Sequence, residues 1–221
     1  MFYVILNKRF DDSQYAYGEY RYMHHNTGDC QYCKGCGSPI GKLEWLPPYE
    51  IKVSKKKLGD FIYGNFPGFI ISQRVKDDFE QMNLKGIYDY KKVNVYYRNQ
   101  LLSVDYYYPV IKILYTHIDT SYFERAKNQE GKKLCPTCQK GCIEDVIYDL
   151  INGIHFLNPN EIHEDVFHTT IFGQGIVYMS EAFKKVIDEK KYTNINYIES
   201  TKYKYDFLGR DLNLLYLQSK E

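Results

Sequence analysis

The stretches Cys30-Gln-Tyr-Cys-Lys-Gly-Cys-Gly37 and Cys135-Pro-Thr-Cys-Gln-Lys-Gly-Cys142 contain all six cysteines of the 221-residue chain. A Cys-x-x-Cys turn lets two thiolates approach one ion, and two such turns complete a tetrahedral shell. A thioredoxin-like redox pair is the main alternative for a single Cys-x-x-Cys, but two pairs without a clear strand-to-helix junction favour a metal. The two stretches therefore predict a zinc (Zn²⁺) site that joins distant parts of the chain.

Six cysteines are two more than a four-ligand site needs. Because a glycine directly follows Cys36, we expect the ligands to be Cys33, Cys36, Cys135 and Cys138. Cys30 could replace Cys36, and His24 or His25 could contribute. A closed four-thiolate shell leaves no coordination position for water or substrate, so we expect the zinc to be structural.

The composition is that of a globular protein, with 44% hydrophobic and 26% charged residues. The formal net charge of +1 gives no strong field for a nucleic acid or an anionic membrane. The apolar run Met1–Leu6 is shorter than a secretory signal requires and predicts a first strand instead, and no stretch is long enough to span a membrane. We therefore expect a cytoplasmic protein with reduced thiols and no membrane partner.

The two cysteine stretches open half-chains that resemble each other, about 30–97 and 135–200. Cys30 and Cys135 are separated by 105 residues, and so are Asp60 and Asp165. Such internal similarity is typical of a repeated structural unit.

Each half-chain predicts an apolar strand, a serine N-cap, an amphipathic helix, a loop and a tyrosine-rich strand. The serines are Ser72 and Ser180, and the loops contain Gly86 and Asn194, residues that tolerate the left-handed conformation at a helix end. The prediction is one α+β domain over residues 1–221. It consists of two related strand-helix-strand units with mixed or antiparallel sheet, held by the four-Cys zinc site.

Patterns elsewhere are weaker. They predict strands over 88–97 and 110–117, an edge or turn over 105–109, an exposed connector or short helix over 121–133, a helix or a strand over 143–151, a loop over 152–164 and a docked element with four leucines in the tail 203–221.

The chain contains 24 tyrosines, and such aromatic enrichment favours strands and also supplies contact surfaces. Neighbouring strand residues point to opposite faces, so Tyr106, Tyr107 and Tyr108 cannot all be buried, and the same holds for Tyr96 and Tyr97. Exposed tyrosines are favoured interface residues. We therefore predict partner binding at Tyr106, Tyr107 and Tyr108.

No phosphate-binding loop, nucleophile elbow or zinc-protease motif occurs in the sequence. His163 and His168 lie in the densest titratable cluster, which we interpret as a solvated loop. These observations favour a non-enzymatic binding protein. A nucleic-acid-binding zinc-knuckle module is the main alternative, and an enzyme that gathers residues from both halves is a third.

Several motifs resemble those of the bacterial double-CXXCG motif proteins. They are Cys33-Lys-Gly-Cys-Gly37, Leu43-Glu-Trp-Leu-Pro-Pro-Tyr49, Gly59-Asp-Phe61, Phe69-Ile-Ile-Ser-Gln-Arg74, Cys135-Pro-Thr-Cys138, Asp165-Val-Phe167 and Val177-Tyr-Met-Ser-Glu-Ala-Phe183. That family is grouped with immunity proteins of contact-dependent toxin systems. The resemblance implies a zinc-bound fold and, by association, a cognate protein toxin as partner. Gln139 and Ala182 depart from the pattern, which has glycine and arginine there, and Cys30 and Cys142 lie outside it.

Overall fold

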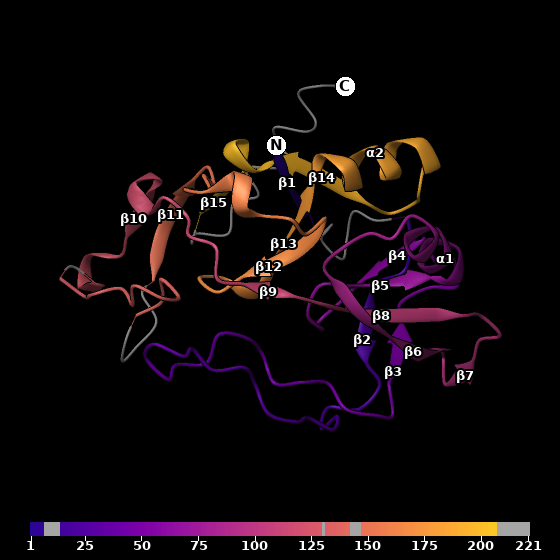
Figure 1. Cartoon of the computed structure of the whole chain (residues 1–221). Coiled ribbons are helices and arrows are strands. Elements are labelled where there is room, and N and C mark those ends of the chain that lie inside the picture. The colour runs from indigo at the N-terminus through magenta and orange to yellow at the C-terminus, as the bar shows by residue number, and fades with distance from the viewer. Residues whose placement is uncertain (7–13, 130, 142–146, 207–221) are drawn as a thin grey trace.

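The computed structural model describes residues 1–6, 14–129, 131–141 and 147–206 (Figure 1). These residues form a mostly β structure with two short α-helices, so helix contributes less than the predicted α+β class implies. The helices are α1 (Gln73–Gln81) and α2 (Glu181–Lys190). The strands are β1 (Phe2–Leu6), β2 (Gly18–Tyr20), β3 (Glu50–Val53), β4 (Phe61–Tyr63), β5 (Phe69–Ser72), β6 (Ile87–Tyr97), β7 (Gln100–Leu101), β8 (Tyr106–Ile111), β9 (Ile113–Leu114), β10 (Phe123–Arg125), β11 (Tyr148–Asn152), β12 (Val166–Thr169), β13 (Gly173–Ser180), β14 (Asn196–Glu199) and β15 (Lys204–Asp206).

The strands form three sheets, which follow one another across Figure 1. A seven-stranded sheet has the order β2-β3-β6-β8-β5-β4, with β7 paired to β6, and a five-stranded sheet has the order β14-β1-β13-β12-β9. The third sheet is β10-β11-β15. Pairs β3·β6 and β9·β12 are parallel and the other strand pairs are antiparallel, which confirms the prediction of mixed and antiparallel sheets.

The seven-stranded sheet closes on itself where its two edge strands meet. Gly18 in β2 forms a parallel bridge with Gly64, the residue after β4, and the N–H of Asn65 donates to the Gly18 carbonyl. A Cβ atom on Gly64 would lie 2.3 Å from that carbonyl oxygen, so the closure requires a glycine there. The result is a small barrel whose edges are paired.

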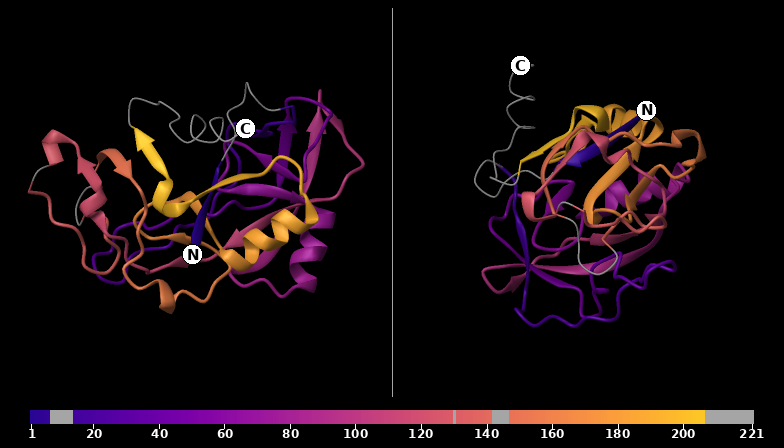
Figure 2. Two further views of the ribbon diagram at one scale, coloured as in Figure 1. Left: turned by 90° about the horizontal axis from the view of Figure 1, so that it is seen from above. Right: turned by 90° about the vertical axis from the view of Figure 1, so that its left-hand side faces the viewer.

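Three hydrophobic cores alternate with the sheets. One fills the barrel and includes Trp45, and another lies between the five-stranded sheet and the third sheet. The central core lies between the two large sheets and takes side chains from both helices. Figure 2 shows the helices lying side by side, and the Phe79 and Phe183 ring centroids are 4.7 Å apart. Strand alternation divides the side chains of β5: Phe69 and Ile71 face the central core, while Ile70 faces the barrel interior.

The two half-chains make corresponding contacts at the starts of their helices. In each, an antiparallel hairpin (β4·β5 or β12·β13) leads directly into a helix. The Ser72 hydroxyl donates to Asp60 at 3.0 Å, and the Ser180 hydroxyl donates to Asp165 at 2.8 Å. Ser180 also caps its helix by accepting from the N–H of Phe183, whereas the Ser72 side chain makes no such cap bond.

Each half also receives a strand from elsewhere in the chain. β8 lies between β5 and β6, and β1 takes the corresponding place between β13 and β14. The Tyr107 hydroxyl on β8 donates to Gln73 at 2.5 Å, and the Tyr3 hydroxyl on β1 donates to Glu181 at 2.7 Å. Gln73 and Glu181 are the first residues of the two helices, so the two strands dock in the same way.

Several weaker predictions are corrected by the strand pairing. Residues 105–109 do not form an edge or a turn, because β8 lies between β5 and β6 in the seven-stranded sheet. The pairing with β5 ends at Tyr107, so Pro109 pairs with β6 alone and the sheet tolerates its missing N–H. In the segment 121–133, predicted as an exposed connector or short helix, the structure has strand β10 and a short 3₁₀ helix, Lys127–Gln129. Of the segment 143–151, residues 148–151 belong to strand β11, while 143–146 and the leucines of the tail lie outside the described residues.

Candidate metal centre

Two short turns, one from each half-chain, have the same backbone hydrogen bonds. The N–H of Cys33 donates to Ser38 and its carbonyl accepts from Gly37; the N–H of Cys135 donates to Lys140 and its carbonyl accepts from Gln139. Bridges Tyr32↔Pro39 and Leu134↔Gly141 close the turns at equivalent places. These hydrogen bonds fold each Cys-x-x-Cys so that both of its sulfurs lie on one side, a geometry known as a zinc knuckle.

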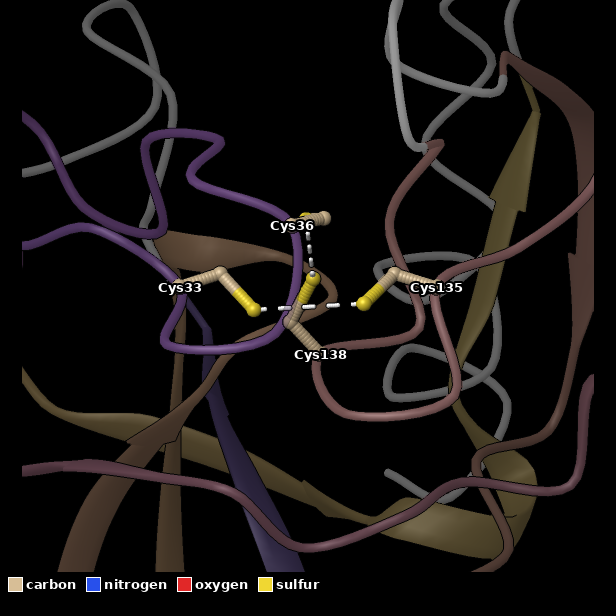
Figure 3. Close-up of side chains that lie close together, drawn as sticks. All are labelled: Cys33, Cys36, Cys135 and Cys138. Carbon is tan, nitrogen blue, oxygen red and sulfur yellow. Dashed lines mark hydrogen bonds between the residues drawn. The ribbon is translucent and has the colours of Figure 1, made fainter.

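The two knuckles face each other, and their four sulfurs converge (Figure 3). The sulfurs of Cys33 and Cys135 are 3.9 Å apart, and those of Cys36 and Cys138 are 3.8 Å apart. All four sulfurs lie within 4.8 Å of one another. Four ligands placed about 2.3 Å from a tetrahedral zinc ion are separated by about 3.8 Å, whereas bonded disulfide sulfurs are about 2.05 Å apart. The donor set therefore fits a tetrahedral metal ion.

The contact between the knuckles depends on a glycine. A Cβ atom on Gly35 would lie 2.3 Å from the Thr137 hydroxyl oxygen, and Thr137 occupies the equivalent position of the other knuckle. The Lys140 ammonium donates to the Pro39 carbonyl at 2.9 Å and adds a second link between them. Ile40, which is 1% exposed, packs against the cysteines and excludes water.

The thiols differ in their affinity for protons. Burial raises the pKa of the Cys138 thiol. Burial also acts to raise the pKa of Cys135, but N–H groups of Cys138 and Thr137 outweigh it and lower that pKa to about 6. Hydrogen bonds from Ser38 lower the pKa of Cys36. A cation in the centre would favour deprotonation of all four, because a coordinated thiol binds as thiolate.

The structure brings together the four cysteines that the sequence predicted as ligands and leaves the alternatives outside. Cys30 is half-buried away from the cluster, and the His25 ring stacks on Tyr20 at 3.6 Å instead. Cys142 lies outside the described residues. The 105-residue offset is wrong for the knuckles: Cys33 corresponds to Cys135, an offset of 102. The longer offset applies only further along, at the aspartates.

The tyrosine prediction is corrected at two of its three positions. Tyr106 and Tyr108 are 7% and 8% exposed and face the barrel core, and the Tyr106 hydroxyl donates to the Gly59 carbonyl at 2.7 Å. Tyr107 is half-buried against α1. The alternation argument is right in form, but the barrel interior takes up Tyr106 and Tyr108, and α1 covers the opposite face at Tyr107.

The two histidines of the predicted loop do not converge. His163 is exposed, as expected for a solvated loop. His168 is 2% exposed on β12, and its Nδ1 lies 2.7 Å from the Ile176 carbonyl, which can only accept a hydrogen bond. His168 therefore belongs to the core as a neutral imidazole.

One side chain that supports the site was not predicted. Gln139 ends the second knuckle with a positive φ of 59°, as Gly37 does in the first with 72°. The Gln139 amide then bonds to the backbone of Ile118. Gln139 stands where the double-CXXCG motif has glycine, and this departure was the sequence signal for a role beyond ending the knuckle.

No protein-family model matches this sequence, and no curated protein is similar to it. Among the described residues, no helix is long and apolar enough to cross a membrane.

Proposed function

We propose that Cys33, Cys36, Cys135 and Cys138 hold a structural Zn²⁺ ion and that the chain is a non-enzymatic binding protein. The paired sulfur distances of 3.9 and 3.8 Å carry the metal assignment. Four thiolates in tetrahedral arrangement suit zinc or iron, and metal analysis separates the two. When bound, the ion would supply a cross-link and no open coordination position for chemistry.

The cross-link explains what the metal would do for the fold. The ligands come from two loops far apart in sequence, one before each β-hairpin. Zinc binding to a four-ligand site is worth about 10–16 kcal/mol in small peptides, comparable with the whole stability of a domain. We therefore propose a single zinc-stapled domain over residues 1–221, with repeat-like halves at about 30–97 and 135–200.

For the partner, we propose a cognate bacterial protein toxin, with the chain acting as its immunity protein in the cytoplasm. The resemblance of the Cys33–Gly37 and Cys135–Cys138 motifs to double-CXXCG proteins supports this proposal. The nucleic-acid alternative has less support, because a formal net charge of +1 provides no strong attraction for a polyanion.

Co-expression with the toxin encoded beside this gene tests the proposal. The wild-type chain should restore growth and co-purify with the toxin. The double variant Cys135→Ser/Cys138→Ser should lose both effects, whereas Cys30→Ser, outside the cluster, should keep them. Failure of the wild-type chain to bind or protect would contradict the immunity role.

A further inference from the structure

A cleft of 370 Å³ is lined by residues of strands β6 and β8 and of the long loop between β2 and β3. Its lining combines aromatic rings with carboxylates. Trp45 and Tyr108 are buried, with ring centroids 5.5 Å apart, while Leu43 and Tyr88 are 54% and 64% exposed. A cleft of this size with exposed apolar residues is typical of a binding site.

Three carboxylates line the same cleft, and two of them have partners. Asp29 accepts hydrogen bonds from the Tyr32 hydroxyl and the Cys30 N–H, and Asp89 forms an ion pair with Lys91. Within the described ranges, Glu44 has neither an ion pair nor a side-chain hydrogen bond, and it is exposed. The Glu44 carboxylate therefore has no direct partner among the described residues of the cleft.

The charge of Glu44 acts on the aromatic residues of the cleft. Burial raises the pKa values of Tyr88 and Tyr108, and the Glu44 carboxylate raises both further. The hydrogen bond to Asp89 raises the pKa of Lys91, and the Glu44 carboxylate makes a smaller contribution in the same direction. Glu44, Tyr88 and Tyr108 all line the same cleft, so the carboxylate and the two rings border one space.

Two lysines, Lys42 and Lys91, line the cleft beside its three carboxylates, so the lining carries one more negative than positive charge. The backbone N–H of Lys42 donates to the Gln174 side chain at 3.0 Å, and the Lys42 charge adds to the burial that lowers the pKa of His168. Lys42 also lines a separate, smaller cavity of 200 Å³.

We propose that this cleft binds an arginine side chain of the protein partner, with the guanidinium against Tyr88 and its charge balanced by Glu44. A planar guanidinium stacks on aromatic faces and also pairs with carboxylates. The inference rests on the proposed function, since it names the chemistry by which the partner would be recognised.

Trp45 is the single tryptophan of the chain, so its fluorescence reports directly on the cleft. The probe is the peptide acetyl-Gly-Arg-Gly-amide, and the control is the same peptide with citrulline, which has the shape of arginine without its charge. We expect a saturable fluorescence change with arginine and an affinity at least about tenfold weaker with citrulline. Equal affinities, or no saturable change, would overturn the proposal.

Two variants locate the site. Glu44→Gln and Tyr88→Ala change exposed side chains, and each should weaken binding of the arginine peptide by about fivefold or more. Glu124→Gln, on the exposed face of β10, should leave it unchanged. Unchanged binding in both cleft variants would contradict the assignment. If the wild-type protein binds the toxin but not the arginine peptide, the cleft assignment is wrong and the proposed function stands. If it binds the peptide but not the toxin, the proposed function is wrong.

Discussion

The side-chain amide of Gln139 forms two hydrogen bonds with the backbone of Ile118. Its oxygen accepts from the Ile118 N–H at 2.7 Å, and its nitrogen donates to the Ile118 carbonyl at 2.8 Å. Ile118 is fully buried in the core beneath the third sheet. The pair thus ties the second knuckle to that core.

Gln139→Gly should destabilise the protein, although glycine suits the positive φ better. The exchange removes about 1 kcal/mol of backbone strain but leaves two buried backbone groups without partners, at about 1–3 kcal/mol each. We expect a net loss of about 1–5 kcal/mol in the free energy of unfolding, measured by urea denaturation. A variant as stable as the wild type would show that the amide contributes nothing.

Gly86→Ala should cost far more than Gly37→Ala, although both glycines have a positive φ. A Cβ atom on Gly37 meets nothing within 4 Å, so only the strain of about 1–2 kcal/mol applies. A Cβ atom on Gly86 would lie 1.8 Å from the Val166 carbonyl oxygen. We expect a loss of about 3 kcal/mol or more, or failure to fold. Similar losses in the two variants would contradict the contact between this loop and β12.

Asp60→Asn and Asp165→Asn should each destabilise the protein by about 1–3 kcal/mol. Each aspartate accepts from a serine hydroxyl in its own half and from a backbone N–H in the other, that of Thr193 or Lys85. An asparagine amide would place its NH₂ against one of these donors. Asp149→Asn, on an exposed side chain, is the control and should change thermal stability little. If neither aspartate variant lowers the stability, these hydrogen bonds do not hold the halves together.

Protonation of His168 should destabilise the fold in acid. Burial lowers its pKa from 6.5 to about 4, against the smaller opposing effect of its bond to Ile176. Between pH 6.5 and 4 the unfolded chain therefore binds more protons than the folded protein. The stability that depends on neutral His168 is complete above pH 6.5 and is lost as the pH falls through that window. The expected loss is about 3 kcal/mol.

His168→Asn isolates this effect, because asparagine keeps a donor near the Nδ1 position. Urea midpoints measured from pH 7 to pH 4.5 should fall less steeply for the variant than for the wild type. Other groups titrate in both proteins and cancel in the difference. Parallel curves would show that His168 does not titrate in the unfolding equilibrium.

The local features of the fold follow from the sequence, and the long-range ones do not. Apolar spacing and the serines Ser72 and Ser180 were enough to predict both helices, and the Cys-x-x-Cys spacing predicted the four clustered thiols. The position of β8 inside the sheet could not be predicted, because the tyrosine run that ends at Pro109 carries an edge-strand signal. One of its two neighbours, β5, also lies before α1 in the chain.

The insertion of β1 into the sheet of the second half was hidden for the same reason. β1 pairs with β13 and β14, near the other end of the chain, and no local pattern encodes such pairing. Side-chain contacts such as those of Asp60 with Thr193 likewise depend on which loops meet. Residue type indicated that the aspartates recur, but only the fold shows what they bind.

The metal content of the purified protein tests the central claim most directly. Elemental analysis should find one zinc ion per chain in the wild type and in Cys30→Ser, and almost none in Cys135→Ser/Cys138→Ser, whose thermal unfolding should begin at a markedly lower temperature. A metal-free wild-type protein with the same cooperative unfolding, or zinc retained after the loss of Cys135 and Cys138, would contradict the account.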